Sequence, residues 1–193
     1  YSFDIVVIET GEDELIRDMF LRLQNGTTLK AAEKRNAMSG AMREWVASLA
    51  QHPFFENCGF QNYRFAFDQV AAQMTLLEIA GEPANTKDAD LKKMYENYVK
   101  FDFNSGDGKR VSSQMKRVLD FLARAFSDKT PELQRFTAIS LYFLVSTLYK
   151  THVVKGIEPG FRNWFIDFEQ RRRAEAEKSV DARDPELVAY HEY

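Results

Sequence analysis

The side chains best suited to chemistry gather in residues 20–37, where a polar turn joins two predicted helices. Four basic side chains stand there against one acidic side chain, a local excess of three positive charges. The amino terminus of the second helix adds a partial positive charge and free backbone amides, which suit a phosphate. The stretch is therefore a candidate site for a nucleotide or DNA. Its candidate binding residues are Arg22, Gln24, Asn25, Lys30, Glu33, Lys34, Arg35 and Asn36.

The same stretch also fits an ordinary helix–turn–helix hairpin. Gly26 can end the first helix as its C-cap, and Thr28 can begin the second helix as its N-cap. Glu33 and Arg35 would then form ion pairs on the surface. Because capping alone can explain the pattern, this structural interpretation stays open beside the binding interpretation.

The other residue types that carry chemistry have no suitable spacing. His52, His152 and His191 are far apart, and none has a cysteine or carboxylate at metal-ligand spacing. Cys58 stands among phenylalanines, which predicts a buried structural thiol. No glycine-rich phosphate loop of either common pattern occurs. The sequence therefore predicts no catalytic residue, no metal site and no cofactor within this chain.

The order of residues in the same stretch resembles a known family. The residues run Phe20-x-Arg22-Leu23-x-Asn25-Gly26, then Leu29, then Glu33-Lys34-Arg35-Asn36-Ala37. This order, after a predicted strand and a capped helix, is similar to the GmrSD-type restriction endonuclease amino-terminal domain family. The nucleotide-binding part of that family resembles ParB and sulfiredoxin, and its members are typically prokaryotic defence proteins against modified or foreign DNA.

The resemblance implies a β-rich domain whose Asp-Gly-Gln-Gln-Arg motif binds and hydrolyses a nucleotide. A second motif, Phe-x-x-x-Asn, follows at the end of a helix, and a helical region comes after it. Phe20 would anchor the second motif. In strict register Gln24 replaces the asparagine of that motif, and Asn25 is adjacent, so either residue can take the family role. Their neighbours on the following helix would be Glu33, Arg35 and Asn36.

Two parts of the family pattern are missing from this sequence. It contains no Asp-Gly-Gln-Gln-Arg motif, and none of the His-Asn-His nuclease pattern that many family members carry at their carboxy terminus. The resemblance therefore implies the helical portion of a defence protein, which contributes part of a nucleotide- or DNA-binding site and is catalytically incomplete alone. A nucleoside triphosphate would bind only in a longer parent protein. The alternative is a non-enzymatic helical module that binds a protein partner through an exposed apolar patch near residues 161–168 or at the strand edge.

The elements that position the stretch are predicted to be mainly α-helical. Apolar periodicity predicts about seven helices, near residues 10–26, 28–52, 67–81, 86–98, 111–126, 130–149 and 161–178. One strand is predicted at residues 3–8, where Phe3, Ile5 and Val7 alternate. Because a lone strand leaves its backbone groups unpaired, we expect its sheet to lie upstream of this chain or on another molecule.

These elements suggest three segments. Residues 1–28 would form the strand–helix edge of a nucleotide-binding α+β domain, residues 29–180 a helical domain and residues 181–193 an irregular tail. The formal net charge of −3 does not indicate that the protein as a whole attracts nucleic acid. A nucleic-acid site must therefore be a local basic patch. A single cysteine and the lack of a bilayer-length apolar run predict a cytoplasmic protein without a membrane segment.

Overall fold

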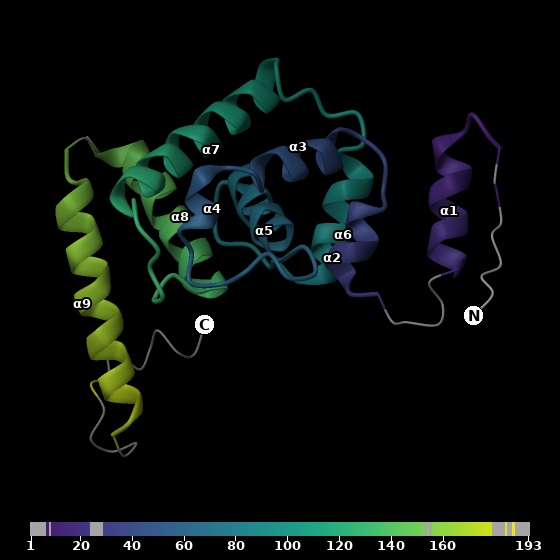
Figure 1. Cartoon of the computed structure of the whole chain (residues 1–193). Helices are drawn as coiled ribbons and strands as arrows, with labels where there is room; N and C mark the ends of the chain where they lie inside the picture. Colours follow the sequence, from purple (N-terminus) through teal and green to yellow (C-terminus); the bar gives the residue numbers. More distant parts are fainter. Residues whose placement is uncertain are drawn as a thin grey trace. The chain divides into compact units, whose positions relative to one another are not determined.

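The computed structural model is mainly α-helical, as predicted (Figure 1). It describes residues 7, 9–23, 29–152, 154, 156–178, 184 and 187, with the backbone alone for residues 20–23. Its helices are α1 (Asp13–Leu23), α2 (Ala31–Asn36), α3 (Ala41–Leu49), α4 (Pro53–Glu56), α5 (Ala66–Ala80), α6 (Asp88–Asn97), α7 (Gly106–Ala125), α8 (Arg135–Thr151) and α9 (Glu158–Ala176). The predicted strand at residues 3–8 falls outside the described residues except for Val7, which is exposed and in no regular element.

The described residues form nine helices, where the sequence predicted about seven. The predicted helix at residues 28–52 is two helices, α2 and α3, separated by residues 37–40, and Gly40 is the N-cap of α3. Gly40 has a φ of +111°, a conformation that other residues rarely adopt, and a Cβ atom there would lie 2.8 Å from the carbonyl oxygen of Val99. Ala41 donates its backbone N–H to that same oxygen at 2.8 Å. The second additional helix, α4, is a single turn that begins at Pro53.

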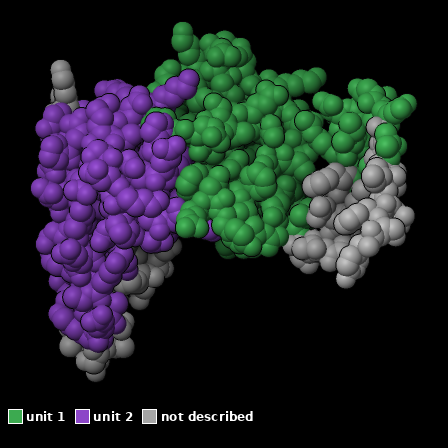
Figure 2. Space-filling view, in the orientation of Figure 1, with its two compact units in different colours: residues 1–52, 61–115 green, residues 53–60, 116–193 purple. Residues whose placement is uncertain are grey.

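The chain divides into two compact units (Figure 2). Unit 1 contains residues 1–52 and 61–115, and unit 2 contains residues 53–60 and 116–193. The predicted segment boundaries at residues 28 and 180 both lie outside the described residues, so they stay predictions.

The core of unit 1 is formed by α3, α5 and α6. Small residues on α5, Ala71 and Ala72, are fully buried and let neighbouring side chains approach the helix closely. Trp45 of α3 stacks on Phe103, with ring centroids 4.5 Å apart. The other large buried apolar side chains of these helices are Met42, Val46, Leu49, Val70, Met74, Leu77, Leu91, Met94 and Tyr95.

The core of unit 2 is built from aromatic rings. Phe126 meets Phe165 edge-on at 5.4 Å, and Phe121 meets Phe161 edge-on at 5.3 Å. Cys58 is fully buried, and burial raises the pKa of its thiol to about 12. The thiol therefore stays protonated at neutral pH, which confirms the prediction of a buried structural cysteine.

No helix within the described ranges is both long and apolar enough to cross a membrane.

Candidate functional site

The second half of the predicted site lies on α2 and at its start. Lys30 is the residue before α2, and its backbone N–H donates to the Glu33 carboxylate at 2.7 Å. This hydrogen bond satisfies an amide that the helix itself leaves without a partner. The predicted cap, Thr28, lies outside the described residues. Lys30 and Lys34 are both exposed, and their spacing of four residues puts them on one side of the helix.

Glu33 is held by a two-pronged ion pair with Arg64. The Arg64 Nε atom donates to Oε1 at 2.7 Å, and the Arg64 Nη2 atom donates to Oε2 at 2.6 Å. These hydrogen bonds, helped by the Lys30 amide, lower the pKa of Glu33 from 4.5 to about 2. The same pair raises the pKa of Arg64. Both groups are therefore ionised at neutral pH, and they tie α2 to the turn that precedes α5.

That turn has an unusual backbone. Arg64 and Phe65 have positive φ values of 53° and 61°, which side-chain-bearing residues rarely adopt, least of all in succession. The turn is supported by Asn62, whose side-chain oxygen accepts the Phe67 backbone N–H at 2.9 Å. It presents two aromatic side chains to solvent, Tyr63 at 69% exposure and Phe65 at 39%. We call residues 61–65 the aromatic turn.

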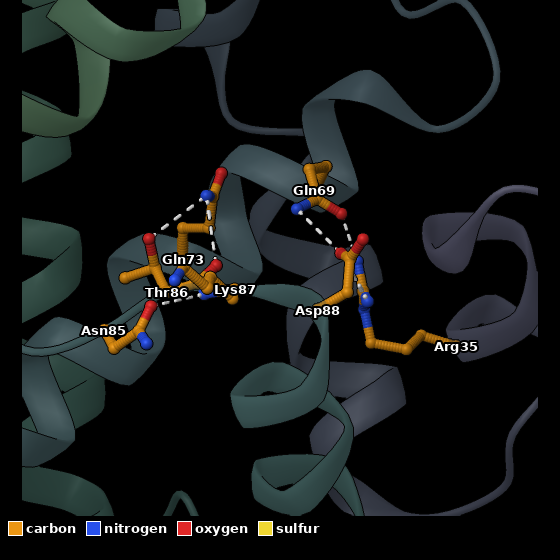
Figure 3. Close-up of polar contacts among 7 residues, drawn as sticks. All are labelled: Arg35, Gln69, Gln73, Asn85, Thr86, Lys87 and Asp88. Atoms are coloured by element: carbon orange, nitrogen blue, oxygen red, sulfur yellow. Dashed lines mark hydrogen bonds and ion pairs between the residues drawn. The ribbon is translucent and has the colours of Figure 1, made fainter.

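Arg35 connects α2 to two other helices, α5 and α6. Its side chain is only 4% exposed, and its Nη1 atom lies 3.1 Å from Oδ1 of Asp88 at the start of α6. Its Nη2 atom donates to the side-chain oxygen of Gln69 on α5. Figure 3 shows Arg35, Gln69 and Asp88 converging from three different helices. Because Asp88 is 61% exposed, one side of this ion pair remains hydrated.

The position of Asp88 is set by the connection between α5 and α6. Gln73, one turn after Gln69 on α5, donates to the Thr86 hydroxyl at 3.2 Å and to the Thr86 carbonyl at 3.3 Å (Figure 3). Asn85 accepts the backbone N–H of Lys87 at 3.2 Å. Gln69 and Gln73 thus fix the position of residues 86–88, where α6 begins.

A polar cluster lies around Arg35. Arg43 donates to the carbonyl oxygen of Asn36 at 3.3 Å. Burial raises the pKa of both the Asp68 carboxyl and the Tyr95 phenol. The side chains close on one another and leave no space for a water molecule. The cluster is therefore a packed network that positions α2, and it offers no open pocket for a ligand.

The structure separates the predicted site residues into two kinds. Lys30 and Lys34 face solvent, whereas Glu33 and Arg35 pair with other residues of unit 1, and Asn36 is half-buried in the polar cluster around Arg35. The hairpin interpretation expected surface ion pairs for Glu33 and Arg35, and both pairs exist, but Arg35 is buried. The remaining predicted residues are not placed: for Arg22 the structure describes the backbone alone, within α1, and Gln24 and Asn25 lie outside the described residues.

Sequence reasoning missed the partners of these residues, above all Arg64, Gln69 and Asp88. One local signal was present, because Gln69 and Gln73 stand four residues apart, and therefore on one face, of a helix that is mostly apolar. No local pattern links Arg35 to Asp88, which is 53 residues away. The side chains that the structure describes contain no group of three or more His, Cys, Asp or Glu residues placed to hold a metal ion.

Comparison of the chain with protein-family models, with curated proteins and with solved structures found no match.

Proposed function

We propose that this chain is the helical portion of a prokaryotic defence protein that acts on modified or foreign DNA in the cytoplasm. It contributes one edge of a nucleotide- or DNA-binding site. The resemblance in residues 20–37 suggests the family, and the placement of Lys30 and Lys34 carries the proposal. Nucleotide hydrolysis and DNA cleavage are assigned to other parts of a longer protein, whose sheet would pair with residues 3–8.

The charge around α2 supports this assignment. Glu33 is neutralised by Arg64, and Arg35 is neutralised by Asp88. The exposed charge of residues 30–36 is therefore that of two lysines, held on a helix whose position is set by both ion pairs. With only six residues, α2 adds little from its own dipole, so the lysine ammonium groups are the phosphate-binding groups.

The test is the salt dependence of DNA binding. We expect the affinity of the wild-type chain for DNA to fall linearly with salt on logarithmic axes. The double variant Lys30→Ala/Lys34→Ala should bind more weakly, with a slope smaller by about 1.4 to 1.8, the value for two lost phosphate contacts. Arg35 is unsuitable for this test because its removal disturbs the packing of α2.

A matched control removes two exposed lysines elsewhere in unit 1, Lys100 and Lys109. This variant has the same net charge as the Lys30/Lys34 variant and should keep the wild-type slope. The proposal fails if the wild-type chain binds neither DNA nor nucleotide, or if the two lysine pairs have equal effects.

A second candidate function is suggested by α9. Trp164 is 45% exposed and stacks on Phe168, with ring centroids 5.8 Å apart and an angle of 19° between the planes. We call these two residues the α9 patch. An aromatic pair with one exposed ring and one half-buried ring suits a protein partner. In that case the chain binds no nucleic acid at any salt concentration, and Trp164→Ala abolishes its interaction with the partner.

A further inference from the structure

The aromatic turn carries a feature that packing does not require. Four aromatic side chains are exposed among the described residues, and two of them, Tyr63 and Phe65, stand on either side of Arg64. An exposed ring leaves apolar surface in water, and a ligand that covers the ring removes that surface from water at a gain in free energy.

The turn is also held in a strained conformation. The positive φ values of Arg64 and Phe65 are each disfavoured, and strain of this kind persists only where surrounding contacts enforce it. Here the contacts are the paired hydrogen bonds from Arg64 to Glu33 and the hydrogen bond from Phe67 to Asn62. The backbone that carries the two rings is thus fixed before any ligand arrives, which lowers the entropic cost of binding.

The ion pair that fixes the turn also joins it to the segment that carries the exposed lysines. Glu33 lies between Lys30 and Lys34 in the sequence, and Arg64 lies between Tyr63 and Phe65. Two aromatic rings beside two ammonium groups are the combination that binds single-stranded nucleic acid, because the rings stack on bases and the ammonium groups contact phosphates. A duplex keeps its bases stacked inside and offers no free face to these rings.

We propose that Tyr63 and Phe65 form a base-stacking platform for single-stranded nucleic acid, with Lys30 and Lys34 as the adjoining phosphate contacts. This inference rests on the proposed function and narrows its ligand from nucleotide or DNA to an unpaired strand. It adds the aromatic turn to the site and gives Arg64 a positioning role, since its pair with Glu33 joins the turn to the segment that carries the lysines.

The test compares three probes by fluorescence anisotropy: an oligothymidylate of about 12 nucleotides, an abasic strand of equal length and a duplex of equal length. We expect the wild-type chain to bind the oligothymidylate about 10-fold or more tightly than the abasic strand. The variant Tyr63→Ala/Phe65→Ala should lose this difference and keep its salt slope. Tyr63→Phe, which retains the ring, should retain the difference.

The variants also separate the inference from the proposed function. Equal wild-type affinity for the oligothymidylate and the abasic strand overturns the stacking platform, as does an alanine variant that keeps the difference. In either case a salt slope that depends on Lys30 and Lys34 would still support the proposed function. If the wild-type chain binds none of the three probes, the stacking platform fails, and the proposed function fails with it if the chain also binds no nucleotide. The single variant Tyr63→Ala is a check on folding, because a side chain that is 69% exposed can be removed without disturbing the core.

Discussion

Two helices of this protein are held in place by different physical means. The six-residue helix α2 is fastened by ion pairs, from Glu33 to Arg64 and from Arg35 to Asp88. The nineteen-residue helix α9 is fastened by rings, with Phe161 and Phe165 buried against other aromatic side chains. Ring burial supplies stabilising free energy, whereas ion pairs add little net stability but fix geometry. Burial of rings thus makes α9 mainly a contributor to stability, whereas the ion pairs of α2 fix the position of the proposed phosphate-binding lysines.

The largest effect on stability is expected from removing a buried ring of α9. Phe165→Ala should lower the free energy of unfolding of unit 2 by about 3–5 kcal/mol, because Phe165 is 2% exposed and its removal leaves a cavity. Urea unfolding followed by tryptophan fluorescence measures the change. Trp164→Ala, at a neighbouring exposed position, should cost less than about 1 kcal/mol by circular dichroism. Equal costs would show that α9 is not held by its buried rings.

The next largest effect is expected at Arg35, the buried member of its ion pair with Asp88. Arg35→Ala should lower the free energy of unfolding of unit 1 by about 2 kcal/mol, because the hydrogen bonds to Asp88 and Gln69 are lost. Asp88→Asn should cost less than about 1 kcal/mol, because Asp88 is largely hydrated. Urea unfolding of both variants checks this order. A larger cost for Asp88→Asn would contradict the asymmetric burial of the pair.

The Glu33–Arg64 pair should give unit 1 a pH dependence. The pKa of Glu33 is about 2 in the folded chain against an ordinary 4.5, so the unfolded chain binds the proton first as the pH falls. The stability that the pair contributes is therefore complete above pH 4.5 and is lost as the pH falls towards 2. We expect the difference in unfolding free energy between wild type and Glu33→Gln to shrink over this range. A constant difference would mean that the pair does not form in solution.

The smallest effect on stability is expected from the exposed lysines. Lys30→Ala/Lys34→Ala should change the free energy of unfolding by less than about 0.5 kcal/mol, because neither side chain is buried. The same variant should show the reduced salt slope described above. A loss of stability that matches the loss of DNA binding would assign both lysines to the fold and remove them from the site.

The sequence predicted the helical class well, because apolar periodicity is a local property. The stripe of Val111, Met115, Val118 and Leu122 is buried on α7 as expected. The break at Gly40 was missed because the apolar pattern continues across it from Met38 to Met42, and the reason for the break is a contact with Val99, distant in the chain.

The site was predicted only in part, because its basic residues are a local feature of the sequence and their partners are not. The basic character of residues 30–36 is visible in the sequence, but the division into exposed lysines and a buried arginine is not. That division depends on Asp88 and Arg64, which reach α2 only through the fold. The aromatic turn was missed because its strain and exposure are properties of the folded backbone.

Photo-cross-linking tests most directly whether nucleic acid binds at α2 and the aromatic turn or at α9. A single-stranded oligonucleotide that carries bromodeoxyuridine is irradiated with the wild-type chain, and the modified peptide is identified by mass spectrometry. We expect the adduct on the peptide that contains Tyr63 and Phe65, and its loss in Lys30→Ala/Lys34→Ala. Adducts confined to Trp164 and Phe168 would contradict the assignment of the site to α2 and the aromatic turn.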